Sequence, residues 1–212
     1  HEGKARTAQK LVEEAAQAGV DAVKFQKFTA AELLVKSHPR YQHFKDLEMP
    51  DADWAALFQT ARGKNLQIYC DVFGLESLAF VRKAGIDGLK LHSSDINNEA
   101  LLQEVAGTWN KSILLSCGGV TELEIIRALQ ILKTAKSEGR IVLMHGFQSF
   151  PTAAGNTHLN RIQTLKQFRC PVGIMDHIDA ESPLALMVPL LAVAAGAQVI
   201  EKHITLDRSA KG

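Results

Sequence analysis

The stretch AGIDGLK at residues 84–90 ends an apolar, helix-like segment at a glycine and then continues into a run of aliphatic residues. The same pattern occurs at residues 18–24 as AGVDAVK, and residues 195–201 carry a looser copy, AGAQVIE. A glycine commonly ends an α-helix, and short aliphatic runs indicate buried strands. The repeated pattern therefore predicts units in which a helix leads into a strand. Each copy brings a charged residue to its seventh position: Lys24, Lys90 and Glu201.

Apolar runs of this length recur along the whole chain. They occupy residues 21–26, 66–73, 88–93, 112–117, 141–146, 172–177 and 199–206. Each interval between them can hold one helix and two loops, and strands that alternate with helices indicate a parallel sheet. Because eight strands close such a barrel, we predict the α/β class and a TIM (β/α)8 barrel whose first strand and last helix lie outside this sequence. A doubly wound open sheet is the alternative, but its glycine-rich nucleotide-binding motifs do not occur.

Composition limits the classes of function. The 212 residues carry a formal net charge of +1 and 6% aromatic residues, so neither a nucleic acid nor an anionic membrane is an expected partner. The longest apolar run, residues 184–195, is too short to cross a bilayer and contains Pro189. Three cysteines without a C-x-x-C pair indicate a reducing compartment, and we expect a cytoplasmic protein. We expect one barrel domain over residues 1–212, incomplete at both ends.

Local signals place several helix ends and one loop. Thr121 and Glu124 have capping-box spacing, and Asn98 is expected to cap the helix that follows it. Ser182 and Pro183 suit the first positions of the apolar helix before Gly196. Residues 27–50 form the longest irregular stretch, which is either an active-site loop or a decorated connection.

Two histidines suggest a metal site. The active site of a barrel forms at the carboxyl ends of its strands, where His177 and His203 lie one βα unit apart. Their imidazoles can converge on one divalent cation, with Glu201 or Asp176 nearby and the open positions left to water or substrate. The alternative is a hydrogen-bonded core role for each histidine. Alternation places Glu201 and His203 on one face of the strand and Lys202 on the other, where a structural role is expected.

A second set of residues suits an anion. Lys24 and Lys90 supply ammonium groups, while Ser93, Ser116 and Gln148 supply neutral donors, which together could surround a phosphate or a carboxylate. The alternative is that each lysine pairs with a carboxylate at a strand end. After Asn98 is assigned to the helix cap, Asp95 is left for the site.

In their order along the chain these residues resemble the sialic acid synthase family, whose barrel enzymes join phosphoenolpyruvate to an N-acylhexosamine. The similar segments are VKFQ (23–26), KLHSSDINN (90–98), SCG (116–118), LMH (143–145), FPT (150–152), DH (176–177) and IEKHITLD (200–207). The resemblance implies a TIM barrel that forms a nonulosonic acid and phosphate. It also implies a small C-terminal antifreeze-like domain, absent from this sequence, and a homodimer if the full-length chain carries that domain.

The resemblance assigns roles to individual residues. It implies a Mn²⁺ or Mg²⁺ ion on His177 and His203, and Asp95 as the acidic group that directs water. Phosphoenolpyruvate is expected on Lys24, Lys90, Ser93, Ser116 and Gln148. The amino sugar is expected near Gln26, Asn97, His145 and Glu201.

Four positions depart from the family pattern. Met175 replaces a serine, Asp71 a threonine, Asp95 a glutamate and Gln148 an asparagine. Met175 removes a hydrogen-bond donor and Asp71 adds negative charge, which are both unfavourable beside a phosphate. The alternative function is therefore a divergent or non-catalytic barrel that binds an anionic sugar or a partner in surface polysaccharide synthesis.

Overall fold

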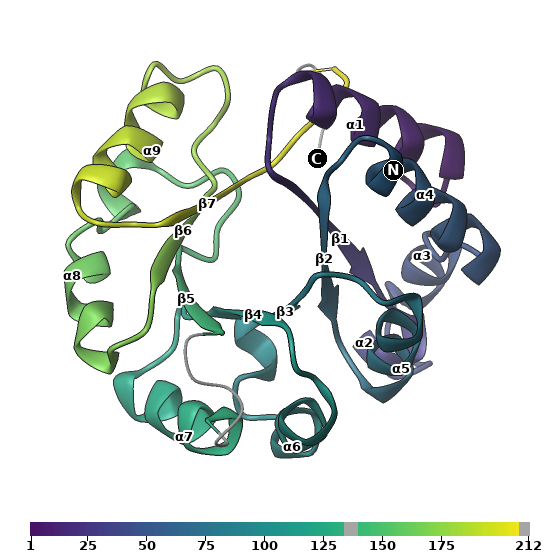
Figure 1. The fold of residues 1–212 in the computed structure, drawn as a ribbon, viewed down its shortest axis with the longest axis horizontal. Helices are drawn as coiled ribbons and strands as arrows, with labels where there is room; N and C mark the ends of the chain where they lie inside the picture. The colour runs from purple at the N-terminus through teal and green to yellow at the C-terminus, as the bar shows by residue number, and fades with distance from the viewer. Residues whose placement is uncertain (134–139, 208–212) are drawn as a thin grey trace. The chain divides into compact units, whose positions relative to one another are not determined.

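The computed structural model describes residues 1–133 and 140–207, and all structural statements concern these residues. Parallel strands alternate with helices along the chain (Figure 1). The strands are β1 (Ala22–Lys27), β2 (Gln67–Val72), β3 (Gly88–Leu91), β4 (Ser112–Ser116), β5 (Ile141–His145), β6 (Val172–Asp176) and β7 (Val199–Lys202). The helices are α1 (Ala5–Gln17), α2 (Ala30–Leu33), α3 (Tyr41–Asp46), α4 (Asp51–Gly63), α5 (Leu75–Ala84), α6 (Glu99–Thr108), α7 (Glu122–Leu132), α8 (Arg161–Leu165) and α9 (Leu184–Ala194). This alternation confirms the predicted α/β class.

Contacts between residues divide the chain into two compact units. The first unit comprises His1–Lys90 with Ile204–Gly212, and the second comprises Leu91–His203. A single domain over residues 1–212 stays a prediction.

The first unit is built on β1 and β2. These strands pair in parallel from Ala22↔Gln67 to Lys27↔Val72, and Asp87 continues the ladder by donating its N–H to the Ile68 carbonyl at 2.9 Å. On one side of β1, Phe25 packs against the rings of Trp54 and Phe58 from α4, with centroids 5.9 and 5.5 Å away. This packing fixes which face of β1 is turned to the helices. The other face carries Lys24 and Gln26.

The second unit contains β4 to β7, paired in parallel in chain order. Gly173 allows the close approach of β5, β6 and β7. A Cβ atom there would lie 2.6 Å from Met144 Sδ and 2.8 Å from the Val199 carbonyl oxygen, both well inside contact distance. The β6–β7 register ends at Asp176↔Lys202, so the residues that follow both strands leave the sheet together.

All seven predicted strands are present, with two differences in local structure. The last strand was predicted to run to residue 206 but ends at Lys202, because β6 ends at Asp176 and offers no further partner. Beyond it, Thr205 forms a local turn, in which the Asp207 N–H donates to Thr205 Oγ1 at 3.2 Å. The stretch 27–50, predicted to be irregular, contains α2 and α3.

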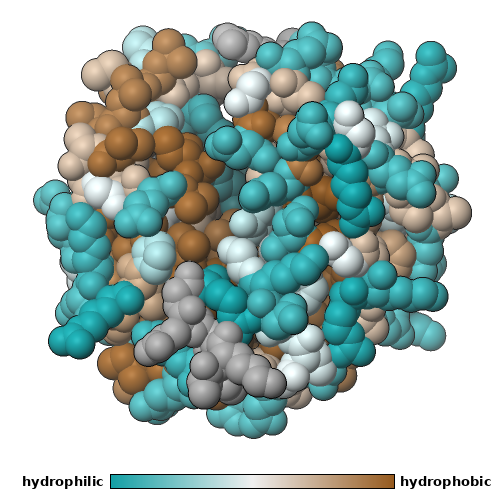
Figure 2. All heavy atoms as spheres, viewed as in Figure 1, coloured by the Kyte–Doolittle hydropathy of each residue, from teal (hydrophilic) through white to brown (hydrophobic). Residues whose placement is uncertain are grey.

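Most of the predicted helix ends are confirmed. Thr121 and Glu124 form the capping box of α7, and Asn98 Oδ1 accepts the Leu101 N–H at 3.2 Å to cap α6. The start of α9 is shifted by one residue, because Pro183 rather than Ser182 takes the N-cap position. Hydrophobic side chains of α9 gather at the upper left of Figure 2. Among the described residues, no helix has both the length and the apolar character that crossing a membrane requires.

Candidate functional site

The predicted anion-binding lysine of β1 is engaged by a carboxylate of β2. Lys24 Nζ lies 2.7 Å from Asp71 Oδ2, and Gln26 Nε2 donates to the same oxygen at 3.2 Å. The strand register explains the contact, because Gln26 is the direct partner of Asp71 and Lys24 lies on the same face two residues earlier. The Lys24 side chain is 19% exposed and that of Asp71 only 1%. Lys24 therefore pairs with a strand-end carboxylate, which was the alternative to anion binding that the sequence left open.

Opposing effects act on the Asp71 carboxyl. Burial alone would raise its pKa, but the charges of Lys24 and Lys90 and the hydrogen bonds from Lys24 and Gln26 outweigh burial. The pKa of Asp71 therefore lies below its ordinary value, and the group is an anion at neutral pH. Lys90, on β3, is almost completely buried, with 3% of its surface exposed. The cluster of Lys24, Asp71 and Lys90 thus carries two positive charges and one negative charge.

The two predicted metal-binding histidines lie together in the second unit. The imidazole rings of His177 and His203 are stacked, with centroids 5.0 Å apart and planes inclined by 27°. His177 follows β6 and His203 follows β7, and the paired ends of these strands bring the two rings side by side. The two rings therefore lie side by side, and their convergence on one cation stays a prediction.

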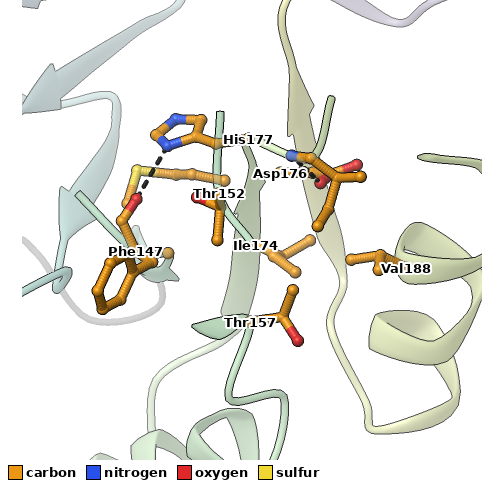
Figure 3. Close-up of a pocket in the computed structure, with 10 residues that line it drawn as sticks. Phe147, Thr152, Thr157, Ile174, Asp176, His177 and Val188 are labelled. Carbon is orange, nitrogen blue, oxygen red and sulfur yellow. Dashed lines mark hydrogen bonds between the residues drawn. The ribbon is translucent and has the colours of Figure 1, made fainter. Parts of the chain in front are cut away.

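A loop between β5 and α8 orients the His177 ring. His177 Nδ1 lies 3.0 Å from the Phe147 carbonyl oxygen, as the dashed line in Figure 3 shows. Because a carbonyl can only accept, Nδ1 carries the hydrogen, and Nε2 keeps its lone pair in the neutral ring. A hydrogen bond of this kind is typical of histidines that bind metals. Below His177 a cavity of about 10 Å³ is lined by Ile174, Asp176 and Val188, which leaves room for about one water molecule.

Phe150 lies beside both imidazoles, although no role was assigned to it from the sequence. Its ring centroid lies 6.0 Å from that of His177 and 4.7 Å from that of His203, although 58% of the residue is exposed. The backbone holds it there, because the Thr152 N–H donates to the His177 carbonyl at 2.7 Å. The FPT segment at 150–152 was the signal that could have identified Phe150.

Asp176, which was considered as a further carboxylate for the cation, is used within the fold. It is buried and forms an ion pair with Lys202, and its Oδ1 accepts the Ile178 N–H at 3.0 Å. Lys202 also donates to the Ala185 carbonyl of α9 at 2.9 Å, which agrees with the structural role expected for it. Glu201 is half-buried on the opposite face of β7. Among residues 1–133 and 140–207, no three His, Cys, Asp or Glu side chains are grouped closely enough to hold a metal ion together.

The predicted donors Ser116 and Gln148 lie at the ends of β4 and β5. Ser116 is fully buried, and its hydroxyl donates to Met175 Sδ at 3.4 Å, so the methionine that replaces the family's serine lies directly against it. A thioether is a weak acceptor, and this hydroxyl therefore has a weak partner. The Gln148 amide lies against Gly118, where any Cβ atom would collide with it.

The segment after β3 holds three predicted residues. Ser93 begins a short 3₁₀ helix, Ser93–Asp95, and the Asp95 carboxylate accepts from Ser94 Oγ at 3.0 Å and from Asn98 Nδ2 at 3.4 Å. Asn97 Nδ2 donates to Glu124 Oε1 at 2.8 Å and so connects this segment to the start of α7. Asp95 is half-buried, whereas Asn97 is exposed.

His145, which was predicted to bind sugar, is 3% exposed at the end of β5. Its Nε2 donates to the Thr157 carbonyl at 2.7 Å, and its Nδ1 has no hydrogen-bond partner among the described residues. Burial is the main reason that its pKa lies below the ordinary value, so the ring is neutral at neutral pH. Its part in sugar binding stays a prediction.

Comparison with known proteins matches residues 11–212 to the model of the NeuB family. An uncharacterised protein of Methanocaldococcus jannaschii is 33% identical over 100% of this chain and 61% of its own length. The N,N'-diacetyllegionaminic acid synthase of Legionella pneumophila is 32% identical over 100% of this chain and 63% of its own length. The crystal structure of N-acetylneuraminic acid (sialic acid) synthetase from Leptospira borgpetersenii, in complex with citrate, has a TM-score of 0.89 and 32% identity, covering 99% of this chain and 71% of that chain.

The likeness to the Leptospira structure extends over nearly the whole chain and confirms the predicted fold class. The chain spans about three-fifths of the length of the curated relatives it matches.

Proposed function

Because the chain belongs to the NeuB family, we propose that it catalyses the condensation of phosphoenolpyruvate with an N-acylhexosamine to give a nonulosonic acid and phosphate. The observation that carries this proposal is the pair of stacked imidazoles at the ends of β6 and β7. Related sequences include a legionaminic acid synthase, and the likeness to a sialic acid synthetase covers almost the whole chain. These likenesses support a synthase that makes a sugar acid of this class.

His177 and His203 fit a divalent metal ion. Two imidazoles at 5.0 Å present nitrogen ligands, and the hydrogen bond from His177 Nδ1 to the Phe147 carbonyl leaves Nε2 available as a ligand. A bound Mn²⁺ or Mg²⁺ would supply Lewis-acid polarisation of a carbonyl oxygen of the sugar. Phe150 covers one side of the ring pair and restricts the positions open to substrate.

The chain's cations would hold phosphoenolpyruvate. Lys24 and Lys90 supply the positive charge that offsets its phosphate and carboxylate, and Ser93, Ser116 and Gln148 supply neutral donors. In the reaction, the methylene carbon forms a bond to the aldehyde carbon of the open-chain sugar. Water then adds to the former enol carbon, and the carbon–oxygen bond to phosphate breaks.

We assign Asp95 to the water step, because its half-buried carboxylate can accept a proton from water. Hydrogen bonds from Ser94 and Asn98 hold this carboxylate in place. We assign the sugar's polar groups to Gln26, Asn97, His145 and Glu201.

Two contacts favour a second candidate, a non-catalytic barrel that binds an anionic sugar or a partner protein. The ion pair of Lys24 with Asp71 and the contact of Ser116 with Met175 occupy groups that an active synthase needs for phosphate. Such a protein would bind an anion or a sugar without turning it over.

Phosphate release distinguishes the two candidates. The chain is incubated with phosphoenolpyruvate, a panel of N-acylhexosamines and Mn²⁺, and free phosphate is measured. We expect release only when all three components are present, and a loss of about 100-fold or more in His177→Ala and His203→Ala. His38→Ala, an exposed histidine in the first unit, serves as the matched control and should leave the rate unchanged. Calorimetric binding of sugar or anion without any phosphate release would favour the second candidate.

A further inference from the structure

We infer that Asp71 sets the charge of the anion site, so that an anion binds to Lys24 and Lys90 together with the uptake of one proton by the Asp71 carboxylate. The inference rests on the proposed function, because it concerns the lysines to which we assign phosphoenolpyruvate. It makes Asp71 a residue that determines anion specificity through its effect on these lysines.

The two oxygens of Asp71 have different surroundings. Oδ2 accepts from Lys24 at 2.7 Å and from Gln26 at 3.2 Å. Oδ1 is buried and has no hydrogen-bond partner among the described residues. Buried carboxylate oxygens are costly to leave without a donor. Oδ1 is therefore the atom at which a proton would be accommodated without displacing Lys24.

The charges around Asp71 explain when that proton would bind. Without substrate, the ammonium groups of Lys24 and Lys90 oppose the effect of burial and keep the carboxyl ionised. A bound anion neutralises the same ammonium groups and places like charge beside the carboxylate. Burial then dominates and favours the neutral acid. The proton comes from solvent, an O–H bond forms at Oδ1, and the new hydroxyl can donate a hydrogen bond.

Among the described residues, the groups that act on Asp71 point to its own carboxyl as the site of proton uptake. The charges of Lys24 on β1 and Lys90 on β3 and the hydrogen bond from Gln26 all act on the Asp71 carboxyl, and Gln26 has no titratable group. On β2 itself, burial raises the pKa of the Cys70 thiol to about 12. Lys27 lies on the opposite face of β1, where it pairs with Asp51 at 3.0 Å and lies 4.9 Å from the centroid of the Phe80 ring. Asp71 is thus the group expected to change its protonation.

Sulfate is a suitable probe, because it remains a dianion throughout the range from about pH 5 to about pH 8.5 used for the linkage measurement. Its binding to the unaltered chain is measured by calorimetry in two buffers of different ionisation enthalpy, which counts the protons taken up. We expect close to one proton per sulfate near neutral pH and an affinity that falls up to about tenfold per pH unit as the pH rises. In Asp71→Asn the proton count should fall to near zero, and binding at about pH 8 should become about tenfold tighter or more.

Asp51→Asn is the matched control, because it removes a carboxylate from the other lysine pair on β1 and should leave the proton count unchanged. A proton count near zero in the unaltered chain, or the same count in Asp71→Asn, would overturn the inference. The count on the unaltered chain decides the matter even if Asp71→Asn does not fold. If neither sulfate nor phosphoenolpyruvate binds the unaltered chain, the proposed function fails. If they bind without proton uptake, only this inference fails.

Discussion

The ion pair between Lys24 and Asp71 gives a test of the electrostatics on which the candidate site depends. Lys24→Met keeps most of the side-chain volume but removes the ammonium group 2.7 Å from Asp71 Oδ2. The Asp71 side chain, 1% exposed, would then be a buried carboxylate that keeps, among the described residues, the hydrogen bond from Gln26 and the charge of Lys90 as support. We expect the folded chain to lose stability at neutral pH.

The size of the loss follows from distance and burial. At 2.7 Å and an effective dielectric constant of about 20, the attraction between the two charges is about 6 kcal/mol. Part of this is offset by the cost of burying the lysine, and breaking a buried pair typically costs about 3 to 5 kcal/mol. Because 19% of the Lys24 side chain is exposed and Lys90 remains, we expect the free energy of unfolding to fall by about 2 to 4 kcal/mol.

The pH dependence of this loss identifies its cause. In the unaltered chain the folded pKa of Asp71 is lowered, so its stabilising contribution is present above the unfolded value of about 3.9 and is lost as the pH falls through the folded value. In Lys24→Met burial dominates and the folded pKa rises, so the penalty is full at about pH 7 and shrinks as the carboxyl protonates on acidification. Urea unfolding at about pH 7 and about pH 4.5 should give a difference at the lower pH less than half that at the higher.

A double variant provides the control. Lys24→Met combined with Asp71→Asn removes both charges and should recover most of the stability lost in Lys24→Met alone. An equal loss at both pH values, or no recovery in the double variant, would refute the electrostatic reasoning and leave side-chain packing as the cause.

Three further predictions concern packing and local electrostatics. Gly173→Ala should lower the free energy of unfolding by about 1 to 3 kcal/mol in urea titrations, because the added Cβ meets neighbouring strands on both sides. Gly155→Ala is the control and should have little effect, because there is open space around Gly155. Hydrogen bonds from the Thr121 N–H and, to a smaller extent, from side chains lower the pKa of the Glu124 carboxyl to about 2, and NMR titration should show this value. Its stabilising contribution is therefore lost only as the pH falls toward that value, and a pKa near 4.3 would contradict the capping box. Burial raises the pKa of the Cys117 thiol to about 12, so a thiol reagent at about pH 8 should label it only after unfolding, and rapid labelling of the folded chain would show that it is accessible.

Periodic signals in the sequence were sufficient for the α/β class and for the positions of the strands. Glycine ends and aliphatic runs are local features, and strands such as β3 and β6 are buried on both faces, so their apolar character appears directly in the sequence. The end of β7 was misplaced because residues 203–206 remain apolar or polar in alternation after the partner strand has ended at Asp176. The helices α2 and α3 were missed because helices of four to six residues carry too little periodicity.

Within the site, the sequence predicted the histidine pair but not the partners of the charged groups. One βα unit separates His177 from His203, and strand-end positions on successive parallel strands lie side by side. Whether Lys24 faces a substrate or Asp71 depends on the register between β1 and β2, which no local pattern contains. The contact of Phe150 with both imidazoles likewise depends on how a loop folds back on β6.

The sequence by itself determined the order of helices and strands, the helix caps at Thr121 and Asn98, and the strand-end positions of the candidate site residues. These features depend on neighbours within a few positions. The choice of partner for each buried charge was decided only by tertiary structure. That choice depends on distances and desolvation among residues about 20 to 50 positions apart. The short contact of Lys24 with Asp71, for example, is one of the interactions that keep the buried Asp71 carboxyl ionised.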